Sequence, residues 1–217
     1  MNKIKLCALA IPMMLSANAF ASSKDFSNPF INMDTEIVDI SHDYIQGKLN
    51  VGEDYKALSI TGSKSLNRMM FVDLKASYAF EGNADAKSLE AGFGLNYPLP
   101  IPVDVMVMDL YAKGFASYSE GIYTIDDKSY EGSIPSIGAI GGIKSNFGSD
   151  LVLLNLYGGM EWISPDDISN KAEDETKMEL VYGAELEFMV GRQTSVILGG
   201  EYRFDEYSFN TALRYSF

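Results

Sequence analysis

His42 is the only histidine in the chain, and it lies between Ser41 and Asp43. A serine, a histidine and an acid are the residue types of a hydrolytic site, in which the imidazole transfers protons for the nucleophile. Neighbouring side chains on a strand point to opposite faces, so these three cannot converge on one substrate from the strand that we expect here. The sequence also has no HExxH motif, no P-loop and no Cys or His cluster with metal-ligand spacing. We expect no catalytic site, metal or cofactor, and a lipid- or peptide-modifying enzyme that uses His42 is kept as an alternative.

A second set of chemically active side chains consists of acids and bases that alternate with apolar residues. If the strands that carry them close around an interior, these side chains would meet there as ion pairs and hydrogen bonds, because an unpaired buried charge is costly. The acids outnumber the bases, which is consistent either with a structural network that holds water and cations or with a path for small cations. The candidate lumen network is Asp73, Lys75, Glu90, Asp109, Lys113, Glu161, Glu179, Glu185, Glu187, Glu201, Arg203 and Arg214.

The strands that position these side chains are clearest in residues 194–217. Apolar or aromatic residues recur there at every second position, which is a strand period and not a helix period. A turn at Asp205 and Glu206 that pairs residue 204 with residue 207 brings the apolar faces of the two strands together. The alternating residues are Val196, Leu198, Gly200, Tyr202 and Phe204, then Tyr207, Phe209, Leu213, Tyr215 and Phe217.

Similar alternation predicts ten strands, with eight as the alternative count. Short connections alternate with longer ones, as expected of a barrel with both ends of its chain on one side of a membrane. The longer ones are 81–86, 120–131 and 164–176, and they fall on the side that would face outward. The predicted strands are 42–51, 56–66, 68–80, 87–97, 104–119, 132–146, 151–163, 177–190, 194–204 and 206–217.

The composition of the less apolar face distinguishes a membrane barrel from a soluble one. This face is rich in Gly, Ser, Asn and Ala, with charges of both signs, and such small residues suit a narrow interior better than a solvated exterior. Aromatic residues gather toward the strand ends, where membrane barrels place their interfacial girdles. The pattern therefore favours strands whose apolar side faces lipid.

In the alternation of its last strands and in the aromatic residue Phe217 that ends them, the chain resembles the small OmpA-type outer-membrane β-barrels of Gram-negative bacteria. The resemblance implies an all-β fold, a closed antiparallel up-and-down transmembrane β-barrel in the cell outer membrane. It also implies contact with outer-membrane lipid and lipopolysaccharide, and with the barrel-assembly machinery during insertion. The residues at the positions of the insertion signal are Leu213, Tyr215 and Phe217.

The beginning of the chain predicts export. Two lysines, an apolar run from Leu6 to Ser16 and the sequence Ala19-Phe20-Ala21 form a signal peptide over residues 1–21. Residues 22–41 are expected to be an N-terminal periplasmic segment, and 42–217 the barrel domain. Removal of the signal leaves 15 of the 17 basic side chains against all 30 acidic ones, and this charge excludes a nucleic-acid partner.

The predicted function follows from a barrel with a polar, side-chain-filled lumen and acidic extracellular loops. We expect a structural or surface-interaction role, with an extracellular partner contacting loops 120–131 and 164–176. The first alternative is a narrow pore for small cations or solutes, and the second is the enzyme considered above.

Overall fold

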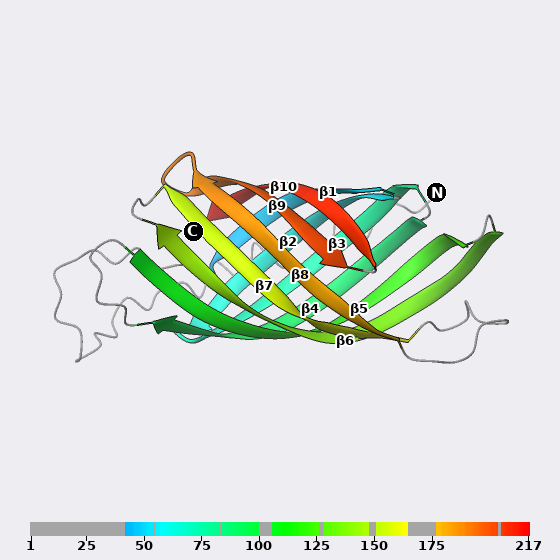
Figure 1. Ribbon diagram of the computed structural model, residues 1–217, viewed down its shortest axis with the longest axis horizontal. Coiled ribbons are helices and arrows are strands. Elements are labelled where there is room, and N and C mark those ends of the chain that lie inside the picture. The colour runs from blue at the N-terminus through cyan, green and yellow to red at the C-terminus, as the bar shows by residue number, and fades with distance from the viewer. Residues whose placement is uncertain are drawn as a thin grey trace. The chain divides into compact units, whose positions relative to one another are not determined.

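The computed structural model describes residues 42–53, 55–82, 84–99, 106–125, 128–147, 151–164, 177–203 and 205–217. These residues form ten antiparallel strands, each paired with its neighbours along the chain, and β1 pairs with β10 to close the barrel (Figure 1). The ten-strand prediction is therefore confirmed, and the eight-strand alternative is wrong. The strands are β1 Tyr44–Gly52, β2 Tyr55–Asn67, β3 Met70–Gly82, β4 Ala84–Leu99, β5 Met106–Ile125, β6 Lys128–Phe147, β7 Val152–Ile163, β8 Lys177–Met189, β9 Thr194–Arg203 and β10 Glu206–Ser216.

Closure leaves the barrel without a free sheet edge along the β1–β10 seam. The seam runs from Tyr44 opposite Ser216 to Gly52 opposite Ser208. Beyond it, the Phe217 amide donates to the Asp43 carbonyl at 3.1 Å. We call the end where β1 begins and β10 finishes the inner end, and the opposite end the outer end. In the part of the chain that the structure describes, no helix is long and apolar enough to cross a membrane.

The register of the last hairpin differs from the predicted one. Arg203 pairs with Glu206 and Tyr202 with Tyr207, so the predicted pairing of 204 with 207 is wrong by two residues. A shift of two keeps every side chain on its face, and alternation could not reveal it. Asp205 has a φ of 58°, a left-handed conformation that aspartate tolerates in tight turns. This turn sets the observed register.

Two outer connections are shorter than predicted. β3 runs to Gly82 and β4 starts at Ala84, so the predicted loop 81–86 is wrong. β5 and β6 pair as far as Ile125 opposite Lys128, so most of the predicted loop 120–131 is strand. Backbone hydrogen bonds between β5 and β6 extend this hairpin without an apolar pattern in its sequence. The predicted signal peptide, the segment 22–41 and residues 165–176 lie outside the described residues.

The two faces of the barrel differ as the alternation predicts. Outward positions carry large apolar side chains that are strongly exposed, up to 81% for Phe209. Inward positions carry charged and amide groups beside many glycines. A Cβ at Gly94 would overlap the ring of Phe71, and one at Gly183 would overlap the ring of Tyr157, so these glycines make room for bulky luminal side chains.

Candidate functional site

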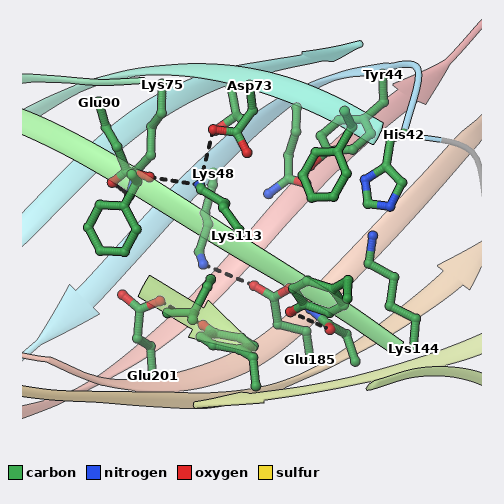
Figure 2. Close-up of a pocket in the computed structure, with 18 of the residues that line it drawn as sticks. His42, Tyr44, Lys48, Asp73, Lys75, Glu90, Lys113, Lys144, Glu185 and Glu201 are labelled. Atoms are coloured by element: carbon green, nitrogen blue, oxygen red, sulfur yellow. Dashed lines mark hydrogen bonds and ion pairs between the residues drawn. The ribbon is translucent and has the colours of Figure 1, made fainter. Parts of the chain in front are cut away.

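The first cluster of the charged interior is built by three neighbouring strands, β3, β4 and β5. Lys113 of β5 lies 3.0 Å from Asp73 of β3 and 2.9 Å from Glu90 of β4, while Lys75 of β3 is 3.8 Å from Glu90 (Figure 2). The strand register places them together, because Lys75 is directly opposite Glu90 and Lys113 is opposite Gly94. One lysine therefore holds two carboxylates that would otherwise repel each other.

Arg203 of β9 joins this cluster to the opposite wall. Its guanidinium donates two hydrogen bonds to Glu161 of β7, at 2.7 and 2.8 Å. Its Nη1 also lies 3.7 Å from Glu90 of β4. Because β4 and β9 are five strands apart in a ring of ten, this contact crosses the lumen. Glu161 is fully buried at 0% exposure, and Ser136 donates to its Oε1, the same oxygen that accepts from Nη2 of Arg203.

A second cluster of contacts joins strands β1, β5, β7 and β8 across the lumen. Lys48 of β1 lies 3.0 Å from Glu185 of β8, which also accepts a hydrogen bond from Asn155 at 3.2 Å. Tyr111 donates to Asn155 at 3.0 Å. These contacts form a continuous polar layer across the barrel. On β7 and β9, Tyr157 donates to Glu201 at 2.6 Å.

The inner end has a third cluster around Arg214. Its Nη1 lies 2.5 Å from Glu187, and its Nε donates to Gln46 at 3.0 Å. The guanidinium also lies over the ring of Tyr44, 4.2 Å from the centroid. Here β1, β8 and β10 are joined through side chains as well as through the seam.

Most of the predicted network residues take part in these contacts. Asp109 lies apart from the central ion pairs and accepts from Asn96 at 3.0 Å. The Oε2 atom of Glu179 is buried, and no described residue forms a hydrogen bond with it. Lys48, Tyr111, Lys144 and Tyr157 belong to the interior and were not predicted. Lys48 lies two residues from Gln46, and Lys144 lies two residues from Asn146, so each lysine points to the same face as its polar neighbour. This alternation could have identified both lysines as interior residues.

The network encloses a cavity of about 160 Å³. Six cationic side chains and four carboxylates line this cavity, while Glu161 and Glu187, the partners of Arg203 and Arg214, lie in the lumen outside its lining. The cations are Lys48, Lys75, Lys113, Lys144, Arg203 and Arg214, and the carboxylates are Asp73, Glu90, Glu185 and Glu201.

His42 lies at the inner end, just before β1, and stacks on Phe71 with 3.8 Å between ring centroids. Burial, followed by the charges of Lys144 and Arg214, lowers the pKa of His42 to about 2, so the imidazole is neutral at physiological pH. Asp43 turns away to bind the Lys64 ammonium at 2.9 Å and the Ser65 amide at 2.6 Å. No group of three or more His, Cys, Asp or Glu residues within the described ranges could hold a metal ion.

The predicted insertion-signal residues point outward. Leu213, Tyr215 and Phe217 are all exposed on β10 and the residue that follows it. The Tyr215 hydroxyl donates to Gln193 at 2.8 Å, and the Lys64 ammonium lies 5.6 Å from the centroid of Phe217. Tyr215 and Phe217 thus lie exposed near the inner end, each beside one polar side chain.

The sequence matches no protein-family model and no curated protein. Among solved structures, the chain is similar to KdgM porin, with 10% identity, a TM-score of 0.43 and coverage of 80% of this chain and 99% of that one. It is similar to NanC porin with 7% identity, a TM-score of 0.42 and coverage of 80% and 99%. It is also similar to Neisserial surface protein A, with 10% identity, a TM-score of 0.39 and coverage of 80% of this chain and 96% of that one.

Proposed function

We propose that this chain is an outer-membrane β-barrel whose lumen is closed by its own side chains and whose role is structural or surface-interactive. The observation that carries the proposal is the Arg203 contact with Glu161 and Glu90, which links opposite walls through the middle of the barrel. A lumen crossed by buried ion pairs favours a filled barrel over an open channel.

The exterior supports the membrane location. A lipid-facing barrel must pair every backbone amide internally and present an apolar surface to hydrocarbon. The barrel closes on itself, and its outward positions are large and apolar around the whole ring. Examples on successive strands are Leu58, Tyr78, Leu89, Leu110, Ile137, Leu156, Leu180, Leu198 and Leu213. Outer-membrane lipid and lipopolysaccharide are accordingly the partners that we propose for this surface, with the barrel-assembly machinery acting on the outward residues of β10.

The alternative of a narrow pore rests on the 160 Å³ cavity. More cationic than anionic side chains line this cavity, and such a lining does not favour the passage of cations. Planar-bilayer recordings of the refolded mature protein separate the two functions, and a variant that lacks residues 22–41 tests that segment as a plug. We expect no channel steps in either protein. Steady steps from the complete mature chain would replace the filled barrel with a pore, and steps only after the deletion would make the segment a plug.

The enzyme alternative has weak support in the interior. His42 is neutral and buried, and Asp43 binds Lys64 instead of His42. We therefore expect the His42→Ala variant to leave lipid A composition and surface proteolysis unchanged in cells that express it at the wild-type level. A change in either product, restored by the wild-type chain, would argue for catalysis.

The surface for an extracellular partner lies on the outer end in this proposal. β5 and β6 pair out to Ile125 and Lys128, while pairing of β6 with β7 ends at Ser136 opposite Ile163. The β5–β6 hairpin therefore extends past its neighbour β7, and with residues 164–176 it supplies the candidate contact region.

A further inference from the structure

Lys144 is a buried cation near the inner end of β6. Its side chain belongs to a residue that is only 6% exposed and lines the luminal cavity. Among the residues that the structure describes, its single close contact is the ring of Tyr111, with Nζ 5.3 Å from the centroid. An aromatic face stabilises an ammonium ion only partly, because it does not replace the hydrogen bonds that water provided.

The other cations of the cavity are arranged differently. Lys48, Lys75 and Lys113 each lie within 4 Å of a glutamate, and so do Arg203 and Arg214. Arg203 and Arg214 pair with Glu161 and Glu187, which lie outside the lining, so among the described residues Lys144 is the lining cation with no carboxylate within 4 Å. The acids nearest in the fold are engaged, because Glu187 binds Arg214, Glu185 binds Lys48, and Asp109 accepts from Asn96.

His42 supplies a second unsatisfied group at the same place. Figure 2 shows the Lys144 ammonium pointing toward the imidazole of His42. Among the described residues, the buried Nε2 atom makes no well-formed hydrogen bond; the Asn96 side chain, whose Oδ1 also has no partner, lies near the ring, and Phe71 covers one face. A neutral imidazole with its proton on Nε2 is a hydrogen-bond donor. An ammonium and a ring N–H that face one cavity are suited to a negatively charged ligand.

We propose that the inner end of the lumen binds one small, singly charged anion between the Lys144 ammonium and Nε2 of His42. A halide and the carboxylate of a small organic acid share this chemistry, and both are small enough for a cavity of about 160 Å³. The anion balances the charge of Lys144 and gives both groups a hydrogen-bond partner. This site is independent of the role proposed above, since it requires neither conduction nor a surface partner.

The single histidine makes the site directly observable. Untagged mature protein, labelled with ¹⁵N in the imidazole and refolded in detergent micelles, gives one histidine signal. Sodium bromide and sodium acetate are titrated separately into sodium sulfate at constant ionic strength. We expect a saturable shift of the His42 ring nitrogens with at least one of the two anions. Saturation by bromide alone identifies a halide site, and saturation by acetate identifies a carboxylate site.

Two variants test the role of Lys144. Lys144→Met should weaken the saturable binding by about tenfold or more, as expected for loss of a charged hydrogen-bond donor. Lys75→Met is the matched control, because it removes a luminal lysine whose partner Glu90 retains Lys113 and Arg203, and it should keep the binding. Absence of a saturable shift in the wild type, or equal binding by Lys144→Met and wild type, overturns the proposal.

A second measurement covers the case in which Lys144→Met does not fold. Crystals of the wild-type protein soaked in bromide should show an anomalous peak in hydrogen-bond contact with Lys144 Nζ. A map in which Asp109 has turned to pair with Lys144, with no bromide peak beside them, overturns the proposal as well.

Discussion

Buried charge pairs in the interior depend on every partner being present. Glu161 is completely buried, and its two strongest contacts come from the Arg203 guanidinium. Removal of one member of a buried pair leaves the other without solvation, whereas removal of both members is often close to neutral. The interior should therefore respond very differently to single and to paired substitutions.

This difference gives the first prediction. Arg203→Met should lower the free energy of unfolding by about 3–5 kcal/mol, because Glu161 is left as an unpaired buried charge. The double variant Arg203→Met/Glu161→Gln should recover most of that loss. Urea unfolding in lipid vesicles measures both, and a double variant less stable than the single one would contradict this account of the pair.

His42 provides a prediction about pH. Its pKa is about 2 in the folded protein against an ordinary value of 6.5, so the unfolded chain binds an additional proton between these two values. The free energy of unfolding therefore falls as pH drops below 6.5, with a slope of up to about 1.4 kcal/mol per pH unit from this residue.

The measurement compares wild type with His42→Phe, which can keep the stack on Phe71. Between pH 7 and pH 5.5 in sodium sulfate, the wild type should lose about 1 kcal/mol more stability than the variant. Carboxylate titrations are common to both proteins and cancel in the difference. Equal pH dependence in the two proteins would show that His42 titrates normally in the fold.

At the scale of single residues, the sequence predicted which strand faces carry the charged side chains but not which of these side chains would form ion pairs. Arg203 and Glu90 are more than a hundred positions apart in sequence, and only the closed ring brings them to 3.7 Å. Lys144 was missed because its neighbours Gly141 and Gly142 weaken the alternation in β6. That no described carboxylate pairs with Lys144 depends on where other side chains end, and periodicity contains no such information.

At the scale of elements, each strand has one face for lipid and one for the lumen. Leu198 lies near the middle of β9 on the exposed face, opposite Leu186 and Thr211. We expect Leu198→Arg to destabilise the barrel in lipid by about 2–4 kcal/mol, the value for a charge near the bilayer midplane. Leu198→Met is the control, and unfolding in vesicles is the readout. A small effect of the arginine would place this face outside the membrane.

The β5–β6 hairpin leads to a prediction about its outer part. Deletion of residues 121–132, with Glu120 and Ser133 joined by an Asn-Gly turn, removes paired positions beyond the β6–β7 contact. The remaining pairs still close the ring, so insertion and heat-modifiable migration in gels should be unchanged. Failure of this variant to assemble would mean that the outer hairpin is needed for folding.

The elements were predicted better than their ends. Alternating apolar residues identified all ten strands, since lipid contact and a crowded lumen impose opposite preferences on the two faces. The outer part of β5 and β6 lacks this constraint and is held by backbone pairing, so its polar and glycine-rich sequence suggested a loop. The two-residue shift in the register of β9 and β10 could not be predicted either, because a shift of two leaves every side chain on the same face of the sheet.

At the scale of the whole molecule, the same contacts that stabilise the barrel also obstruct it. Arg203 extends from β9 to within reach of β4, and Tyr157, Lys48 and Glu185 fill the levels toward the inner end. Loss of the Arg203 side chain removes the contact with Glu90 on the opposite wall but leaves the backbone ring intact. We therefore expect Arg203→Ala/Glu161→Gln to show small channel steps in planar bilayers, while the wild type stays silent. Lys87→Ala, on the outer end and exposed, is a control substitution outside the lumen and should also be silent. If the double variant folds and remains silent, the closure must lie in the remaining luminal side chains or in residues 22–41, and the deletion of that segment in the same variant decides between them.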